Sequence, residues 1–291
     1  MSKKITLSLA VVSIVITTII ISNVYFSQPV RESLTYFPTD SSLTFSIAET
    51  TISLFNKKDN DEYIVNWREV SETEKEVYLR QDISFLFKDG ILDSTMSLWK
   101  EETKFIEQEK RLRGEDSSHY QAISLHHAEI HLKDDQIKSA QMMSHDELYI
   151  IDSSYSPLDS FKQPSNEEQK EWKKVLDHAI NQHLFYSWNE LAKHYNLDLE
   201  TYDAIPFVNL ATYNKTPLPG LTAEESIRVI GQLWEGLYKN YLLGIELTAT
   251  ETVSPIGSKI PLILISKDRS HLIILIETEA GEKVRLFQKI N

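Results

Sequence analysis

The amino-acid sequence predicts an α+β fold with antiparallel sheets, preceded by an N-terminal transmembrane helix. Three observations lead to this class. Residues 5–25 are apolar and uncharged, residues 43–152 largely alternate apolar and polar side chains, and residues 166–241 repeat apolar side chains every three or four positions before the alternation returns. Because strands are followed by helices and then by strands again, the pattern favours α+β over alternating α/β.

Composition limits the classes of protein that fit. The chain has 291 residues, a net charge of −13 and no cysteine. A disulfide framework, a thiolate nucleophile, an iron–sulfur cluster and a cysteine zinc site are therefore excluded. The negative charge disfavours nucleic acid and anionic lipid headgroups as partners.

The apolar run 5–25 has the length that a helix needs to cross about 30 Å of hydrocarbon. Lys3 and Lys4 precede it, and basic residues hold that end of a span in the cytoplasm, so the rest of the chain is expected outside the cell membrane. A cleaved signal peptide needs small residues before the cut, whereas Val24 and Tyr25 stand there. Residues 1–25 are therefore expected to form a cytoplasmic tip and an uncleaved single-pass anchor.

The stretch after the anchor is expected to be a stalk followed by a sheet. Residues 26–42 contain Pro29 and Pro38 and have no sustained period, which indicates a juxtamembrane stalk. Strands are then expected over 43–54, 63–67, 77–87 and 91–99, with a tight hairpin at Asp89-Gly90. These four strands are expected to form an antiparallel β meander.

The rest of the β-rich region, which extends from 43 to 152, is less regular. Residues 101–113 are rich in helix formers and predict a short helix that ends at Gly114. Strands are expected over 120–132, 136–143 and 148–152. Residues 153–165 carry two prolines and five serines and are the expected linker. The patterns leave open whether 43–152 and 166–291 form one domain or two.

A central helical region follows the linker. Ser165 with Glu168 matches a capping box at the start of an amphipathic pattern, which continues either as one long helix or as two helices broken near Ser187. A long loop, 197–221, leads to a second capping box at Thr222 and Glu225. The C-terminal region then predicts a second antiparallel β meander over 245–252, 260–266, 272–278 and 283–288.

The densest group of chemically active side chains is the histidine-rich segment 126–131. On a strand, His127, Glu129 and His131 would share one face, and two imidazoles with a carboxylate are a possible zinc ligand set. The spacing does not match the helical metalloprotease motif, because Ala128 stands where that motif needs glutamate. The alternative interpretation is the solvent-facing side of a half-buried strand.

The function predicted from these patterns is a non-enzymatic interaction or binding module of the bacterial cell envelope, anchored in the membrane and without a cofactor. Its partner is expected to be another envelope protein, bound through a sheet edge or the loop 197–221, where Tyr202 and Tyr213 are candidate contact residues. Tyr186 lies off the helical stripe and is also expected to be exposed. The alternative is a metal-dependent envelope hydrolase that uses His127, Glu129 and His131.

Overall fold

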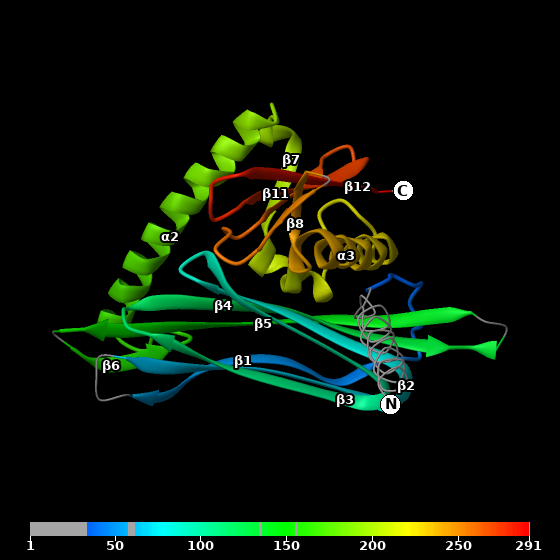
Figure 1. The fold of residues 1–291 in the computed structure, drawn as a ribbon, viewed down its shortest axis with the longest axis horizontal. Coiled ribbons are helices and arrows are strands. Elements are labelled where there is room, and N and C mark those ends of the chain that lie inside the picture. Colours follow the sequence, from blue (N-terminus) through cyan, green and yellow to red (C-terminus); the bar gives the residue numbers. More distant parts are fainter. Residues whose placement is uncertain (1–33, 58–61, 134–135, 155, 249, 291) are drawn as a thin grey trace, which may run out of the picture. The chain divides into compact units, whose positions relative to one another are not determined.

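The fold is α+β, with a long antiparallel sheet, a helical middle and a smaller C-terminal antiparallel sheet (Figure 1). The computed structural model describes residues 34–57, 62–133, 136–154, 156–248 and 250–290. The predicted membrane span, residues 5–25, lies outside this part of the chain. Within the described ranges, no helix combines the length and the apolar character needed to cross a bilayer.

The first sheet is built from six strands, and it is nearly closed into a barrel. Its order is β1-β2-β4-β5-β6, with β3 paired to the other edge of β2. The strands are β1 (Phe45–Lys57), β2 (Tyr63–Lys88), β3 (Ile91–Gly114), β4 (Ser118–His131), β5 (Ile137–Ser153) and β6 (Ser156–Phe161). We refer to this sheet as the long sheet.

The long sheet folds back on itself because β2 has different partners along its length. Its first half lies between β1 and β3, and its second half lies between β3 and β4. The β2–β3 register breaks between Glu72 and Val77, where the strand changes layer. Thr50 Oγ1 of β1 then lies 2.6 Å from Ser124 Oγ of β4 and 2.6 Å from Ser144 Oγ of β5, so the two layers are hydrogen-bonded across the interior.

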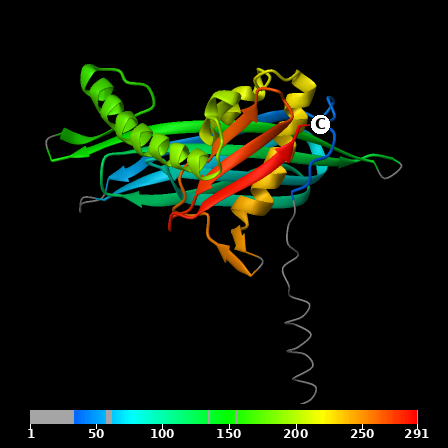
Figure 2. The same ribbon diagram turned by 90° about the horizontal axis from the view of Figure 1, so that it is seen from above.

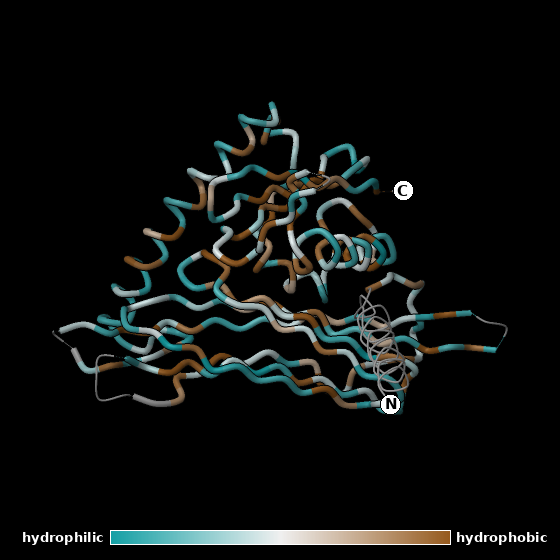
Figure 3. Tube along the Cα trace, viewed as in Figure 1, coloured by the Kyte–Doolittle hydropathy of each residue, from teal (hydrophilic) through white to brown (hydrophobic). Residues whose placement is uncertain are grey.

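The second half of β2 lies in the layer of the long sheet that faces the helices, and both faces of this layer are buried. Phe85 and Phe87 pack toward the helices, whereas Ser84 and Leu86 point into the interior between the layers. Apolar residues, brown in Figure 3, gather where the long sheet faces the helical middle and the C-terminal sheet. Part of the interior is apolar, around Trp67, and the rest is filled by polar side chains.

The helical middle lies over one face of the long sheet (Figure 2). Its elements are α2 (Glu167–His194), the 3₁₀ turn η2 (Leu199–Thr201), β7 (Tyr202–Pro206), the 3₁₀ helix η3 (Phe207–Asn214), α3 (Ala223–Leu237) and the π-helical turn η4 (Tyr238–Leu242). The capping box of Thr222 and Glu225 is confirmed. Helix α2 is unbroken, and its cap is Asn166 rather than Ser165, because Asn166 Oδ1 accepts from Gln169 N at 2.8 Å.

The C-terminal sheet has the order β12-β11-β10-β7. Its meander consists of β10 (Leu262–Ser266), β11 (His271–Glu277) and β12 (Lys283–Lys289), while β8 (Ile245–Thr248) and β9 (Glu251–Val253) form a separate hairpin. The expected antiparallel C-terminal sheet is confirmed. Its fourth strand, β7, comes from the expected loop 197–221, most of which is therefore ordered structure with Phe207 and Leu210 fully buried.

Several other segments differ from the expectation. The strands expected over 63–67 and 77–87 are one strand, β2, those expected over 136–143 and 148–152 are one strand, β5, and the strand expected over 245–252 is the hairpin of β8 and β9. The helix expected over 101–113 is wrong, because these residues continue β3 and pair with β2. Within the expected linker 153–165, β6 adds a strand to β5. In the expected stalk 26–42, the described residues 34–42 lie against the fold, since Leu34 is buried and Ser139 N donates to Pro38 O at 3.0 Å. Sheet pairing supplies backbone partners that local sequence signals do not reveal.

Candidate functional site

The exposed strand β12 forms one edge of the C-terminal sheet. Ile290 N donates to Ser270 O at 3.0 Å. In the antiparallel register that follows, the even-numbered residues of β12 direct their backbone N–H and C=O groups toward β11. The N–H and C=O groups of Arg285, Phe287 and Lys289 therefore point away from β11. We call these three residues the β12 edge; all three side chains are exposed, and Phe287 is 58% exposed.

A groove of about 410 Å³ lies beside the β12 edge. It runs between α3, η4 and the C-terminal sheet, and its lining includes Gln232, Leu233, Gly236, Asn240, Leu286 and Phe287. At the other end of β12, Tyr195 Oη donates to Lys283 O at 2.6 Å and covers that end of the edge. The free part of the strand therefore presents backbone groups, two cationic side chains and an aromatic ring next to a partly apolar groove.

The structure separates the three histidine-segment candidates. His127 and Glu129 lie together on β4, with His127 Nε2 3.0 Å from Glu129 Oε1. Both are buried, at 2% and 6% exposure, so the expected solvent-facing position is wrong for them. His131 is exposed and stacks on Tyr78, with ring centroids 3.6 Å apart. The structure thus brings together two of the three predicted ligands and leaves the third outside.

The tyrosine candidates differ in their exposure. Tyr202 and Tyr213 are half-buried and pack against the main core, and Tyr202 Oη lies 3.1 Å from His271 Nε2. Tyr186 is 70% exposed on α2, as expected. The segment 197–221 therefore turns much of its aromatic surface inward.

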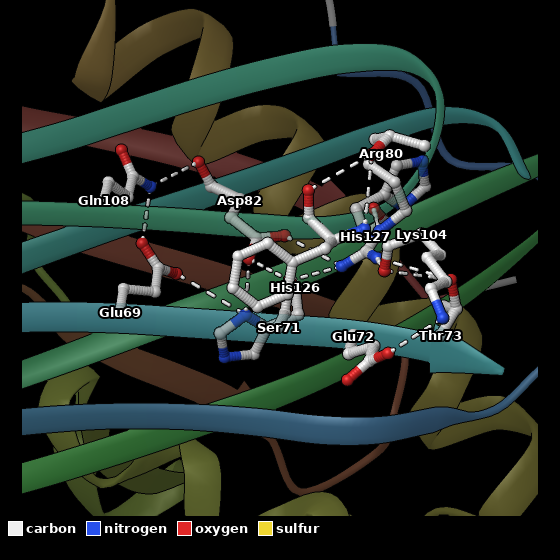
Figure 4. Close-up of polar contacts among 12 residues, drawn as sticks. Glu69, Ser71, Glu72, Thr73, Arg80, Asp82, Lys104, Gln108, His126 and His127 are labelled. Atoms are coloured by element: carbon white, nitrogen blue, oxygen red, sulfur yellow. Dashed lines mark hydrogen bonds and ion pairs between the residues drawn. The ribbon is translucent and has the colours of Figure 1, made fainter. Parts of the chain in front are cut away.

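A different group of titratable side chains lies in the interior of the long sheet (Figure 4). Glu69 and Asp82 come from the two halves of β2, and His126 comes from β4; we call them the interior triad. His126 Nδ1 lies 2.9 Å from Asp82 Oδ2 and 3.6 Å from Glu69 Oε1, and all three side chains are fully buried. Burial and the adjacent Asp82 carboxylate raise the pKa of Glu69 well above its usual range.

Arg80 lies beside the interior triad and is itself fully buried. Its Nη1 donates to Lys104 O at 2.8 Å, and its Nη2 lies 3.6 Å from Asp82 Oδ1 and donates to Ser71 Oγ. The guanidinium carbon also lies 4.9 Å from the centre of the Phe45 ring. Arg80 therefore supplies one positive charge near two carboxylates, but most of its donors serve oxygens other than those of the carboxylates.

The interior triad is not evident from the sequence, for a physical reason. Alternation separates the two faces of a strand, but it does not say which face is interior when both are buried. His126 directly precedes His127, the first of the predicted zinc ligands, and it lies on the opposite face of the strand. Asp82 lies in a clearly alternating strand. Asp82 of β2 lies directly opposite His126 of β4. An acidic residue and a histidine on two strands that pair with each other are the signal that could have identified the site.

A second histidine group joins α2 to the long sheet. His119 of β4 is nearly buried, with Nε2 3.2 Å from Glu147 Oε2 of β5 and Nδ1 3.8 Å from Asp177 Oδ1 of α2. The ring stacks on Tyr149, with centroids 3.8 Å apart, and Tyr149 Oη donates to Asp177 Oδ1 at 2.8 Å. This arrangement fixes the first half of α2 against β4 and β5.

The Glu147→Gln variant should lose a small, pH-dependent contribution to stability. The hydrogen bond from His119 lowers the pKa of Glu147 in the fold. A carboxyl group with a lowered pKa stabilises the fold above its unfolded pKa and loses this effect as the pH falls through the folded value. Because the side chain is 34% exposed, we expect a loss of less than about 1 kcal/mol at pH 7.

The free energy of unfolding at pH 7 and at about pH 3 measures this effect. The loss should shrink toward the lower pH, and the exposed control Glu171→Gln should change little at either pH. An equal loss at both pH values would contradict the assignment to the ionised carboxylate.

No known family, characterised protein or solved structure matches the chain at a significant level of similarity.

Proposed function

We propose that the protein is a single-pass, membrane-anchored binding module of the bacterial cell envelope, and that it holds another envelope protein along the β12 edge. The anchor is inferred from the apolar run 5–25 and the preceding Lys3 and Lys4. This orientation places the folded region outside the cell. The observation that carries the binding role is the outward-pointing backbone of β12 beside its groove.

An unpaired strand edge can bind an extended segment of a partner by adding it to the sheet. Main-chain hydrogen bonds then supply affinity, and pockets for alternate side chains supply specificity. Natural proteins often protect such edges with lysine, and Lys289 also serves that purpose here. The exposed Phe287 does not fit protection alone, because a large apolar side chain favours association.

The charge of the β12 edge indicates the chemistry of the partner. Arg285 and Lys289 are cationic on a chain whose net charge is −13, so the edge is a local exception to the surrounding negative charge. The complementary partner segment is extended and acidic, with an apolar side chain that enters the groove beside Phe287. Of the two routes expected from sequence, the β12 edge is favoured over the segment 197–221, because that segment buries Phe207 and Leu210 in the core and its own edge strand, β7, has only five residues.

The Phe287→Pro variant should weaken partner binding at least about tenfold, which corresponds to roughly 1.4 kcal/mol. Proline removes the outward N–H and the aromatic contact at position 287, yet it leaves the hydrogen bonds to β11 intact. The measurement is photo-cross-linking on intact cells, with the reactive group placed in turn at position 285 and at position 289. Both positions should capture the same protein, and Phe287→Pro should abolish the capture.

Two controls define the outcome. A reactive group at Phe105, which is exposed on β3, should not capture that protein, and Lys100→Glu on the same strand should leave the cross-link from position 285 unchanged. Capture of the same protein from position 105 would contradict the assignment to β12.

Protease applied to intact protoplasts should digest the folded region, and protection from the protease would contradict the orientation.

A further inference from the structure

We propose that the interior triad binds one divalent transition-metal ion, with Glu69, Asp82 and His126 as its ligands. This role is separate from the β12 edge and departs from the sequence-based expectation that the protein has no cofactor. Glu69 belongs to the first half of β2, Asp82 to the second half and His126 to β4. An ion bound by all three would hold the two layers of the long sheet together.

The donor atoms have the separation that a shared ion requires. One donor atom of each residue lies within 4.8 Å of the other two. His126 Nδ1 is 2.9 Å from Asp82 Oδ2 and 3.6 Å from Glu69 Oε1. Ligands bound at 2.0–2.2 Å lie roughly 3–3.5 Å from one another, so only small side-chain shifts are needed to close the site.

Two buried carboxylate oxygens point to a missing positive partner. Among the described residues, neither Glu69 Oε1 nor Asp82 Oδ1 accepts a hydrogen bond, although both are inaccessible to solvent. Burying a polar oxygen without a partner is costly, so such atoms are normally hydrogen-bonded or coordinate a metal. Arg80 approaches only Asp82, at 3.6 Å, and Glu69 has no lysine or arginine as an ion-pair partner among these residues.

Each ligand is held by a second polar group, as in protein metal sites. Gln108 Nε2 donates to Glu69 Oε2 at 2.5 Å, which fixes that carboxylate and leaves its other oxygen free. Ser71 Oγ donates to Asp82 Oδ2. His126 Nε2 lies 2.7 Å from Ser144 Oγ.

A chain of hydroxyl groups indicates which nitrogen of His126 carries its proton. Ser144, Thr50, Ser124 and Ser84 are hydrogen-bonded in series, and Ser84 Oγ donates to Ile123 O. Each hydroxyl donates once, so Ser144 accepts from His126 Nε2–H. The lone pair of His126 Nδ1 then faces both carboxyl groups, an arrangement that requires either a metal ion or a proton between them. A metal ion fills this position under the proposal, and a proton carried by the carboxyl group of Glu69 is the competing explanation.

The donor set selects the class of metal. An imidazole nitrogen with two carboxylate oxygens suits Zn²⁺, Mn²⁺ or Fe²⁺, whereas Ca²⁺ and Mg²⁺ prefer oxygen ligands alone. The site is enclosed on all sides by the sheet, because all three ligands are inaccessible to solvent. We therefore expect the ion to enter while the sheet folds and to leave only when the sheet opens.

The test uses the full-length chain, produced in cells supplied with Zn²⁺ or Mn²⁺ and purified in a mild detergent. After extensive washing with EDTA, elemental analysis should find about one equivalent of metal per chain. Unfolding in denaturant with EDTA should release it. Metal held at exposed histidines would be removed by the wash, so retention identifies the buried site.

Variants assign the ion to the interior triad. Glu69→Gln and His126→Gln should each retain less than about a tenth of the metal of the unsubstituted chain, a loss of more than tenfold. His127→Gln is the matched control, because this neighbouring histidine is also buried but faces the other side of β4, and it should retain the full equivalent. Circular dichroism verifies that each variant is folded.

Two outcomes would overturn the proposal. One is a folded chain that retains neither metal after the EDTA wash, which would leave a proton on Glu69 rather than a metal ion among the three side chains. The other is equal retention by Glu69→Gln, His126→Gln and the unsubstituted chain, which would place the metal elsewhere. Production in cells supplied with Co²⁺ gives a second readout, since the visible absorption spectrum of the bound ion should appear in the His127→Gln chain and be absent in the His126→Gln chain.

Discussion

The Arg80→Met variant should lower the free energy of unfolding by about 3–5 kcal/mol. Arg80 is fully buried and is the fixed positive charge nearest to the carboxylate of Asp82. Removing it leaves that carboxylate without its arginine partner and also leaves Lys104 O without the donor that reaches it at 2.8 Å. Methionine preserves most of the side-chain volume, so the loss reports charge and hydrogen bonding more than a cavity.

The matched control for Arg80 is Arg68, which lies on the same strand. Arg68 Nε is 2.7 Å from Glu107 Oε1, but the two side chains are 40% and 41% exposed. An exposed pair contributes about 0–1 kcal/mol, so Arg68→Met should have a small effect although its ion pair is shorter. Chemical unfolding of the full-length chain in EDTA, followed by tryptophan fluorescence, measures both variants.

A double variant tests whether the loss arises from the buried charge. Arg80→Met combined with Asp82→Asn removes both charges, and it should be more stable than Arg80→Met alone. If the two single-variant losses simply add, Arg80 and Asp82 are not coupled. A loss of less than about 1 kcal/mol for Arg80→Met would likewise contradict the buried-charge interpretation.

Local sequence signals predicted the parts of the fold that local interactions determine. The hairpin at Asp89-Gly90 is confirmed, with Lys88 opposite Ile91 and positive φ angles of 52° and 80° at the two turn residues. The capping box at Thr222 is confirmed for the same reason, since its hydrogen bonds join residues three positions apart.

Tertiary pairing determines the parts that were not predicted. Residues 101–113 are rich in strong helix formers, but nearly all of them pair with β2, and this pairing makes them part of the strand β3. The strand β7 has only five residues and ends at Pro206, so only its pairing with β10 identifies it. The interior triad depends on the same effect, because β2 must fold back before Glu69 and Asp82 can approach one another.

The Trp234→Ala variant should lower the free energy of unfolding by about 3–5 kcal/mol. Trp234 of α3 is fully buried, and its ring centre lies 6.0 Å from that of Phe85 on β2 and 5.3 Å from that of Phe207 on η3. Its Nε1 donates to Met143 Sδ of β5 at 3.2 Å. The side chain therefore joins the helical middle to two strands of the long sheet, and alanine would leave a cavity at that junction.

The same variant tests whether the long sheet and the later elements unfold as one domain, a question that the sequence leaves open. One hydrophobic core contains Phe85 of the long sheet, Trp234 of α3 and Leu264 of the C-terminal sheet, so unfolding any one of them exposes the others. Thermal unfolding should show a single transition in the unsubstituted chain and in Trp234→Ala, shifted to lower temperature in the variant. The exposed control Tyr186→Ala should leave the transition within about 0.5 kcal/mol of its original stability. Two transitions, with only one of them shifted, would instead show that the long sheet is a separate domain.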